Sequence, residues 1–155
     1  MKIHITRGTG EGPTREAAFD KALWDAGISN YNLIRLSSIL PENSEIAEGR
    51  IDWNHKNIGH RLYVVLAEGF ETEPGKELWV GIGWIIAKDG TGVVEYVSGN
   101  SEEYVLEHVE KTLRSDASPR NKEFEYHYRT ISVLCRDFPV SAVIAMVYKS
   151  EGWND

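Results

Sequence analysis

Apolar residues recur at helical spacing in two parts of the chain. The first helix is expected to begin near Pro13 or Thr14 and to end at Gly27. Its core-facing stripe consists of Ala18, Phe19, Ala22, Leu23 and Ala26. A second helix is expected to begin at a capping box of Asn100 and Glu103 and to run to about Arg114. Its buried side chains are predicted to be Val105, Leu106, Val109 and Leu113.

Shorter apolar runs predict strands. Ile3 and Ile5 alternate with polar residues, and further runs cover residues 32–41, 62–67, 78–87, 93–97, 126–135 and 140–148. The glycine-rich stretch 8–12 is expected to be a flexible loop, because it lacks the spacing of a phosphate-binding loop. Residues 42–61 are polar and are expected to be irregular. The pattern predicts an α+β fold of one domain spanning residues 1–155, in which each helix covers one sheet face.

The charge balance bears on the class of partner. The chain of 155 residues has 24 acidic and 17 basic residues and a net charge of −7. This balance disfavours nucleic acid and anionic membrane surfaces and is compatible with a cationic small molecule. No apolar run approaches the roughly 20 residues of a membrane span, and the first residues do not form a signal peptide. We therefore expect a cytoplasmic protein, in which the lone Cys135 is a buried apolar residue.

Two adjacent serines, Ser37 and Ser38, interrupt the apolar run at 32–41. The simplest interpretation is that the strand ends there and that the hydroxyls satisfy backbone groups in a turn before Pro41. The chemical interpretation is self-processing, in which the Ser38 hydroxyl attacks the Ser37 carbonyl and converts the peptide bond into an ester. β-Elimination then breaks the chain and leaves a dehydroalanine at position 38, which hydrolyses to a pyruvoyl group.

The surrounding sequence favours self-processing. It resembles the pyruvoyl-dependent arginine decarboxylases in the order and spacing of five blocks, which are Gly8–Gly12, Ala18–Leu23, Ala26–Asn30, Asn32–Pro41 and Gly92–Tyr96. The run Asn-Leu-Ile-Arg-x-Ser-Ser-Ile is the most specific of these motifs. Weaker similarity extends from about Lys2 to Tyr148.

The resemblance implies a four-layer αββα sandwich that assembles as a homotrimer or as a dimer of trimers. It also implies cleavage between Ser37 and Ser38, a pyruvoyl cofactor derived from Ser38, and decarboxylation of L-arginine to agmatine. Neither a metal nor pyridoxal phosphate is expected, and the five histidines show no ligand spacing. Two alternatives stay open: a pyruvoyl decarboxylase of another amino acid, and an unprocessed, non-catalytic oligomeric relative.

Three further residues match positions with roles in the family. Asn32 is expected to assist processing by donating a hydrogen bond to the Ser37 carbonyl, Glu95 to be the catalytic acid, and Asp20 to bind the substrate side chain. Without the resemblance, each has an ordinary alternative. Asn32 would begin a strand, Glu95 would be an exposed strand carboxylate, and Asp20 would be a solvated helix acid paired with Arg15 or Lys21. The polar, aromatic segment 53–61 departs from the family pattern, and its role is left open.

Overall fold

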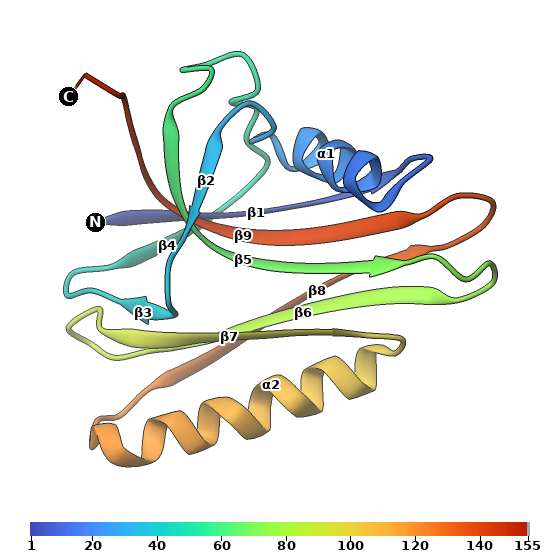
Figure 1. Ribbon diagram of the computed structural model, residues 1–155. Coiled ribbons are helices and arrows are strands. Elements are labelled where there is room, and N and C mark those ends of the chain that lie inside the picture. Colours follow the sequence, from blue (N-terminus) through green and yellow to red (C-terminus); the bar gives the residue numbers. More distant parts are fainter. Residues whose placement is uncertain (155) are drawn as a thin grey trace.

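The computed structural model describes residues 1–154 and shows two β-sheets and two α-helices, which confirms the predicted α+β class (Figure 1). The five-stranded sheet has the order β2-β5-β9-β1-β4, and the four-stranded sheet has the order β3-β7-β6-β8. The first sheet contains β1 (Lys2–Glu11), β2 (Asn32–Arg35), β4 (Glu45–Glu48), β5 (Arg61–Glu71) and β9 (Val140–Glu151). The second contains β3 (Ile39–Leu40), β6 (Glu77–Ile86), β7 (Gly92–Gly99) and β8 (Glu125–Leu134).

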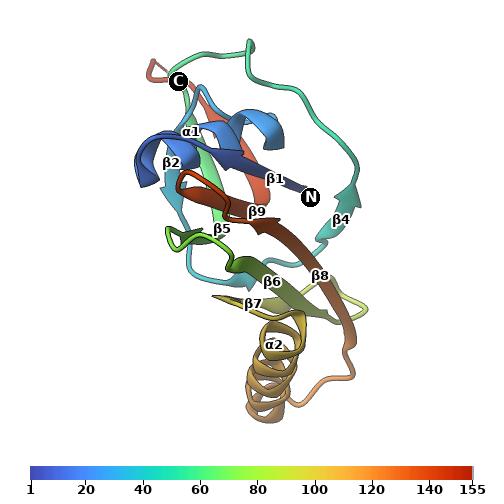
Figure 2. The same cartoon turned by 90° about the vertical axis from the view of Figure 1, so that its right-hand side faces the viewer.

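Each helix packs against one sheet. Helix α1 (Arg15–Ala26) contacts β1 and β9, whereas α2 (Glu102–Ala117) contacts β6 and β7. A short 3-10 turn, η1 (Ser118–Arg120), follows α2 directly. Figures 1 and 2 show the sheets facing each other, with α1 and α2 on their outer sides. No helix in residues 1–154 is long and apolar enough to cross a membrane.

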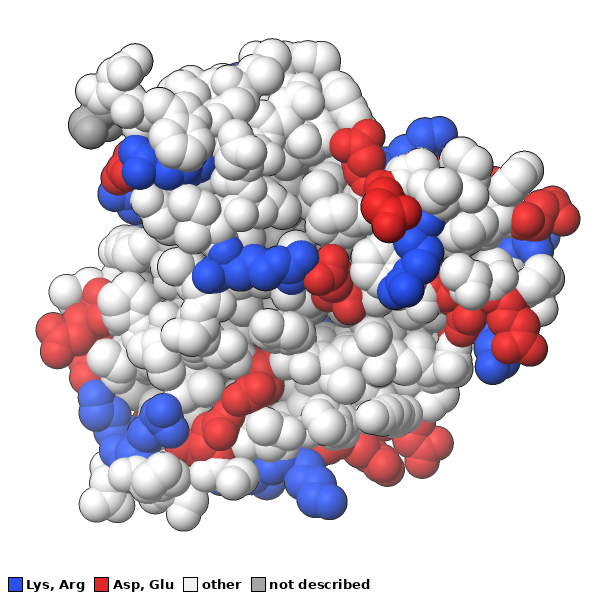
Figure 3. Space-filling model, viewed as in Figure 1, with Lys and Arg blue, Asp and Glu red and all other residues white. Residues whose placement is uncertain are grey.

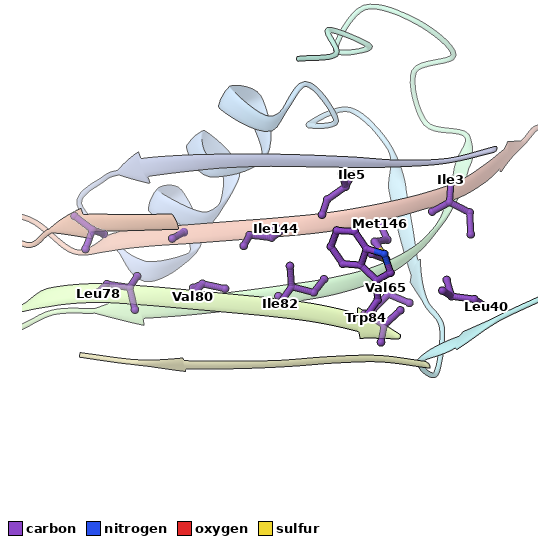
Figure 4. Packing of buried hydrophobic residues seen from close by; sticks show 14 of the residues in the cluster. Ile3, Ile5, Leu40, Val65, Leu78, Val80, Ile82, Trp84, Ile144 and Met146 are labelled. Atoms are coloured by element: carbon purple, nitrogen blue, oxygen red, sulfur yellow. The ribbon is translucent and has the colours of Figure 1, made fainter. Parts of the chain in front are cut away.

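The largest apolar cluster lies between the two sheets (Figure 4). The five-stranded sheet contributes Ile3, Ile5, Val65, Ile144 and Met146, and the four-stranded sheet contributes Leu40, Val80, Ile82, Trp84 and Val94. Separate buried clusters fill the contact between each helix and its sheet. Cys135 belongs to the central cluster and is buried, as the sequence predicted.

The expectation of a flexible loop at Gly8–Gly12 is wrong for most of that stretch, because β1 continues through Gly8 and Gly10 to Glu11. Both glycines pair with β9 and lie directly beneath α1. A Cβ atom on Gly8 would lie 2.5 Å from the backbone nitrogen of Ala26, which is closer than atoms can approach. The glycines therefore allow close contact between strand and helix rather than loop mobility.

The ends of α1 agree with the sequence signals. The Thr14 hydroxyl accepts a hydrogen bond from the Ala17 N–H at 3.1 Å, and Gly27 adopts the left-handed conformation with φ of 82°. The predicted start of α2 at Asn100 is wrong, because Ser101 caps the helix through the Tyr104 N–H. The Asn100 amide instead binds the Glu77 carbonyl at 2.9 Å, and a serine hydroxyl is an equally good cap.

Several boundaries also differ from the predicted ones. Helix α2 continues to Ala117 rather than ending near Arg114, and β5 extends to Glu71. The polar region after Pro41 contains β4, which pairs in parallel with the start of β1. Leu106 is only partly buried, because the inward face of α2 is formed by Val105, Val109 and Leu113.

Candidate active site

The Ser37–Ser38 segment connects the two sheets (Figure 1). Strand β2, in the five-stranded sheet, ends at Arg35, and β3, in the four-stranded sheet, begins at Ile39. Before the serines, the Leu36 N–H donates to the Val64 carbonyl at 2.8 Å; after them, the Val94 N–H donates to the Ser38 carbonyl at 2.8 Å. The apolar run 32–41 is thus not one strand: it is interrupted at the serines, as the simplest interpretation expected, because the chain must leave one sheet and enter the other.

The Ser37 carbonyl lies in a tight turn. The Ile39 N–H donates a hydrogen bond to this carbonyl oxygen at 3.0 Å, which closes a three-residue turn centred on Ser38. The Ser37 residue is exposed, and Ser38 is partly buried. A backbone N–H already directed at the Ser37 oxygen can stabilise negative charge that develops there when the carbonyl carbon is attacked.

Glu95 lies on β7, next to the strand position that holds Ser38. Its chain neighbour Val94 donates to the Ser38 carbonyl, so the fold brings Glu95 and the serine pair together within one chain. On either side of Glu95, Val93 and Val97 belong to the cluster under α2, whereas Val94 belongs to the core between the sheets. The alternation of a strand therefore directs Glu95 toward α2.

The surroundings of Glu95 favour its protonated form. Burial raises the pKa of Glu95 to about 7, and two effects of Asp116 reinforce the rise: it accepts a hydrogen bond from protonated Glu95, and its negative charge disfavours a second charge at Glu95. The positive charge of Arg120 opposes this rise only partly. A carboxyl group with a pKa near neutrality can hold a proton and release it under physiological conditions. The carboxylate at position 95 is therefore suited to proton transfer.

A hollow of about 320 Å³ adjoins the serine turn on the β3–β7 side. Ile39, Pro41 and Phe124 provide apolar walls, and Arg120 and Lys122 bring two positive charges to it. Lys122 is bound to Asp89 at 2.7 Å, whereas the positive charge of Arg120 also lowers the pKa of Glu95. The hollow therefore combines apolar surface with a cation near the candidate proton donor.

The side chain of Asn32 binds the Gly59 carbonyl and not the Ser37 carbonyl. Asn32 is the first residue of β2, and its side-chain amide donates to the Gly59 carbonyl at 2.9 Å while its backbone N–H donates to the His60 carbonyl at 2.8 Å. The extended backbone of β2 separates Asn32 from Ser37. In one chain the Asn32 amide therefore fixes the start of β2 against the preceding loop.

Asp20 lies far from the serine turn in the same chain. It is exposed on α1, and the five-stranded sheet separates α1 from β3 and β7 (Figure 2). Its suggested partner Arg15 is instead placed over the ring of Phe70, with 4.5 Å between the guanidinium carbon and the ring centroid. One chain thus brings Ser37, Ser38 and Glu95 together but not Asp20.

The polar segment 53–61, whose role was open, packs beside the end of α1. The buried Asn54 accepts hydrogen bonds from the Ser29 N–H at 2.9 Å and hydroxyl at 2.8 Å, and it donates to the Trp24 carbonyl at 3.1 Å. Trp53 packs against the cluster under α1. This segment therefore stabilises the chain reversal between α1 and β2.

Sequence reasoning missed three groups near the site: the Ile39 N–H, Arg120 and Asp116. The N–H follows from backbone conformation and leaves no mark in the residue types. Asp116 and Arg120 lie beyond the predicted end of the second helix near Arg114, whereas α2 and η1 carry them over the sheet. Only an extension of the helical apolar spacing to Ala117 would have indicated their position.

Two further observations concern the charge on the surface and the side chains that could bind a metal ion. Acidic and basic side chains are interspersed on the face in Figure 3, so the net charge of −7 forms no single acidic surface there. Within residues 1–154, no group of three or more His, Cys, Asp or Glu side chains is close enough to hold a metal ion.

Comparison with known proteins shows which family this chain resembles. The model of the pyruvoyl-dependent arginine decarboxylase family matches residues 2–150. A pyruvoyl-dependent arginine decarboxylase of Thermococcus kodakarensis is 31% identical over 153 residues, covering 94% of this chain and 93% of the relative. The corresponding protein of Thermococcus sibiricus is 33% identical with the same coverage. One from Methanothermobacter thermautotrophicus is 58% identical over 48 residues, covering 31% of this chain and 32% of the relative.

The chain belongs to the pyruvoyl-dependent arginine decarboxylase family. Membership implies a pyruvoyl group made from a serine of the chain, and the structure has a suitable place for it. The Ser37–Ser38 peptide lies outside the strands, its first residue is exposed, and hydrogen bonds hold the carbonyls of both serines.

Proposed function

We propose that this protein is a self-processing, pyruvoyl-dependent decarboxylase that converts L-arginine to agmatine and CO₂. The observation that carries the proposal is the Ser37–Ser38 turn, whose first carbonyl accepts the Ile39 N–H and whose second accepts the Val94 N–H beside Glu95. Family membership supports both the cofactor and the substrate.

Processing would begin at the Ser38 hydroxyl. Its oxygen attacks the carbonyl carbon of Ser37, the peptide C–N bond breaks, and an ester to Ser38 forms with a free amine on that residue. Loss of the Ser38 α-proton then expels the Ser37 carboxylate and leaves a dehydroalanine. Water replaces its nitrogen, ammonia leaves, and the second fragment begins with a pyruvoyl group. During the first step the Ile39 N–H stabilises the charge on the Ser37 oxygen.

Asn32 would assist processing through position rather than direct contact. Its amide holds the Gly59 carbonyl at the start of β2, and the serines follow the end of this short strand. A fixed β2 keeps the serine turn in the conformation that the attack requires.

Glu95 would deliver the proton that completes decarboxylation. A pyruvoyl group supplies an electron sink for the electrons left by departing CO₂. The raised pKa of Glu95 leaves a large fraction of its side chain protonated near pH 7, and the apolar neighbours Val93 and Val97 limit the access of water. Arg120, at the adjoining hollow, would attract the carboxylate of the amino-acid substrate.

Asp20 would bind the guanidinium group of arginine from a neighbouring protomer. Since α1 and the serine turn are far apart in one chain, a second copy must bring the two together. This arrangement supports the homotrimer, or dimer of trimers, of single-domain αββα sandwiches that the family resemblance implies, and we place the enzyme in the cytoplasm.

Intact mass under denaturing conditions tests the proposal. Cleavage gives fragments of 37 and 118 residues, about 4 and 13 kDa when 17.5 kDa is divided by length. Ser38→Ala should leave one uncleaved chain, because the attacking oxygen is absent. Product analysis with arginine, lysine and ornithine then identifies the substrate.

Each alternative predicts a different result. An intact wild-type chain that releases agmatine would refute the pyruvoyl cofactor, and a cleaved chain that prefers another amino acid would refute arginine as substrate. A chain that neither cleaves nor decarboxylates would indicate an unprocessed oligomeric relative.

A further inference from the structure

Asp116 has an unusual environment for a carboxylate. It is the penultimate residue of α2, it is partly buried, and its Oδ2 atom is buried without a hydrogen-bond donor from residues 1–154. The last turn of a helix exposes carbonyl oxygens and has a partial negative charge, which disfavours a carboxylate there. Neither helix stability nor pairing with a cation therefore explains why a carboxylate is present at position 116.

The carboxyl group of Asp116 lies against that of Glu95. The two side chains are within hydrogen-bond reach, and a hydrogen bond between carboxyl groups needs a proton on one of them. Two ionised carboxylates at this distance would repel each other strongly in a partly buried place. The guanidinium of Arg120 donates to the backbone carbonyl of Asp116 at 2.7 Å rather than to its carboxylate.

Two glycines hold α2 close to the sheet at this point. Glu95, Gly83 and Tyr128 form one row across β7, β6 and β8. A Cβ atom on Gly83 would lie 2.6 Å from Cγ1 of Val109, and one on Gly81 would lie 3.0 Å from the side chain of Val105. Because these positions lack side chains, α2 packs closely enough for its last turn to reach Glu95.

We propose that Asp116 is a positioning residue that shares one proton with Glu95 and so keeps Glu95 protonated until it delivers the proton. The inference rests on the proposed function, because it assigns a purpose to the proton on Glu95. The charged and titratable groups around the pair are Arg120 on η1 and Tyr128 on β8, while Glu110 and Arg114 of α2 bind each other at 2.9 Å.

The test compares Asp116→Asn with a matched control. Asparagine keeps the size and a hydrogen bond to Glu95 but cannot share the proton. Glu107→Gln also removes one negative charge from α2, at an exposed position. Titration of carboxyl carbons by NMR, on protein labelled at the Glu and Asp carboxyl groups, reports the pKa of Glu95 without any need for activity.

We expect the titration near pH 7 to move at least about one pH unit lower in Asp116→Asn and to stay in place in Glu107→Gln. With a pKa of about 6 in place of about 7, the protonated fraction of Glu95 at pH 7.5 falls about eightfold, and kcat should fall with it. At pH 5.5 the rate of Asp116→Asn should recover toward that of wild type, which a merely structural defect would not produce.

A second variant protects the test against misfolding. In Glu95→Gln the shared proton has no second carboxyl, so no titration near pH 7 should remain. An unchanged Glu95 titration in Asp116→Asn, or a surviving titration near pH 7 in Glu95→Gln, would overturn the shared proton. If the shift occurs in a protein that does not decarboxylate arginine, the acid pair stands and the proposed function fails.

Discussion

Substitution of Gly10 by alanine should push α1 away from the five-stranded sheet. A Cβ atom on Gly10 would lie 2.7 Å from the carbonyl carbon of Lys21, and backbone atoms of Ala18 and Ala22 are closer still. Carbon atoms pack at about 3.5–4.0 Å, so the helix must retreat by about 1 Å. The backbone of a helix cannot relieve this clash by rotating away, as a flexible side chain could.

The cost follows from this displacement. Overpacking typically destabilises by about 1–3 kcal/mol, and in a domain of this size each kcal/mol lowers Tm by about 2–4 °C. We therefore expect Tm of Gly10→Ala to fall by about 2–12 °C. The same retreat moves Asp20, and misplacement of a binding group by about 1 Å can cost up to about 100-fold in kcat/KM for arginine.

Thermal unfolding followed by circular dichroism measures the first effect, in a Ser38→Ala background where the chain stays in one piece. Gly99→Ala is the matched control, because it makes the same backbone change at a strand end where the nearest atom is Cδ1 of Tyr104 at 3.3 Å. Equal melting temperatures for the two variants would show that Gly10 is not needed for close packing of α1.

The remaining predictions concern the site. Glu95→Gln should still cleave but decarboxylate about 10²–10⁴-fold more slowly, and wild-type turnover with confirmed pyruvoyl content would refute the proton-donor role. Because the folded-state pKa of Glu95 rises from 4.5 to about 7, its contribution to stability is complete below pH 4.5 and is lost as pH rises through 7; denaturant unfolding should show this slope weakened in Glu95→Gln. Asp20→Asn should raise KM for arginine strongly without slowing cleavage, and lysine should be a poor wild-type substrate, as a substrate panel will show. Asn32→Ala should slow cleavage in a timed mass measurement, and unchanged kinetics would remove Asn32 from processing.

Short-range sequence signals predicted a helix or strand correctly where its position depends mainly on its own residues. The stripe on α1 has a capping threonine before it and a left-handed glycine after it, and all three agree with the structure. The same reasoning failed at Gly8 and Gly10, because their role depends on a helix that packs over them. A glycine looks the same in sequence whether it serves a loop or a close contact.

The site was predictable to the extent that a motif marked it. The motifs named the serine pair and Glu95 as candidates, and the pairing of β3 with β7, with the Val94 N–H bound to the Ser38 carbonyl, brings them close together. The hydrogen bond of Asn32 to Gly59 and the approach of Asp116 to Glu95 depend on how segments distant in sequence meet. Residue types and spacing do not show directly which distant segments come into contact.

The position of β1 has a consequence for the cleaved protein. Cleavage after Ser37 would leave β1, α1 and β2 on the short fragment, yet β1 lies between β9 and β4 of the long fragment. The processed protomer would then be an association of two peptides, with one threaded into the sheet of the other. Its unfolding would become a dissociation, so its midpoint should rise with protein concentration, whereas a monomeric uncleaved chain would melt at one temperature at any dilution.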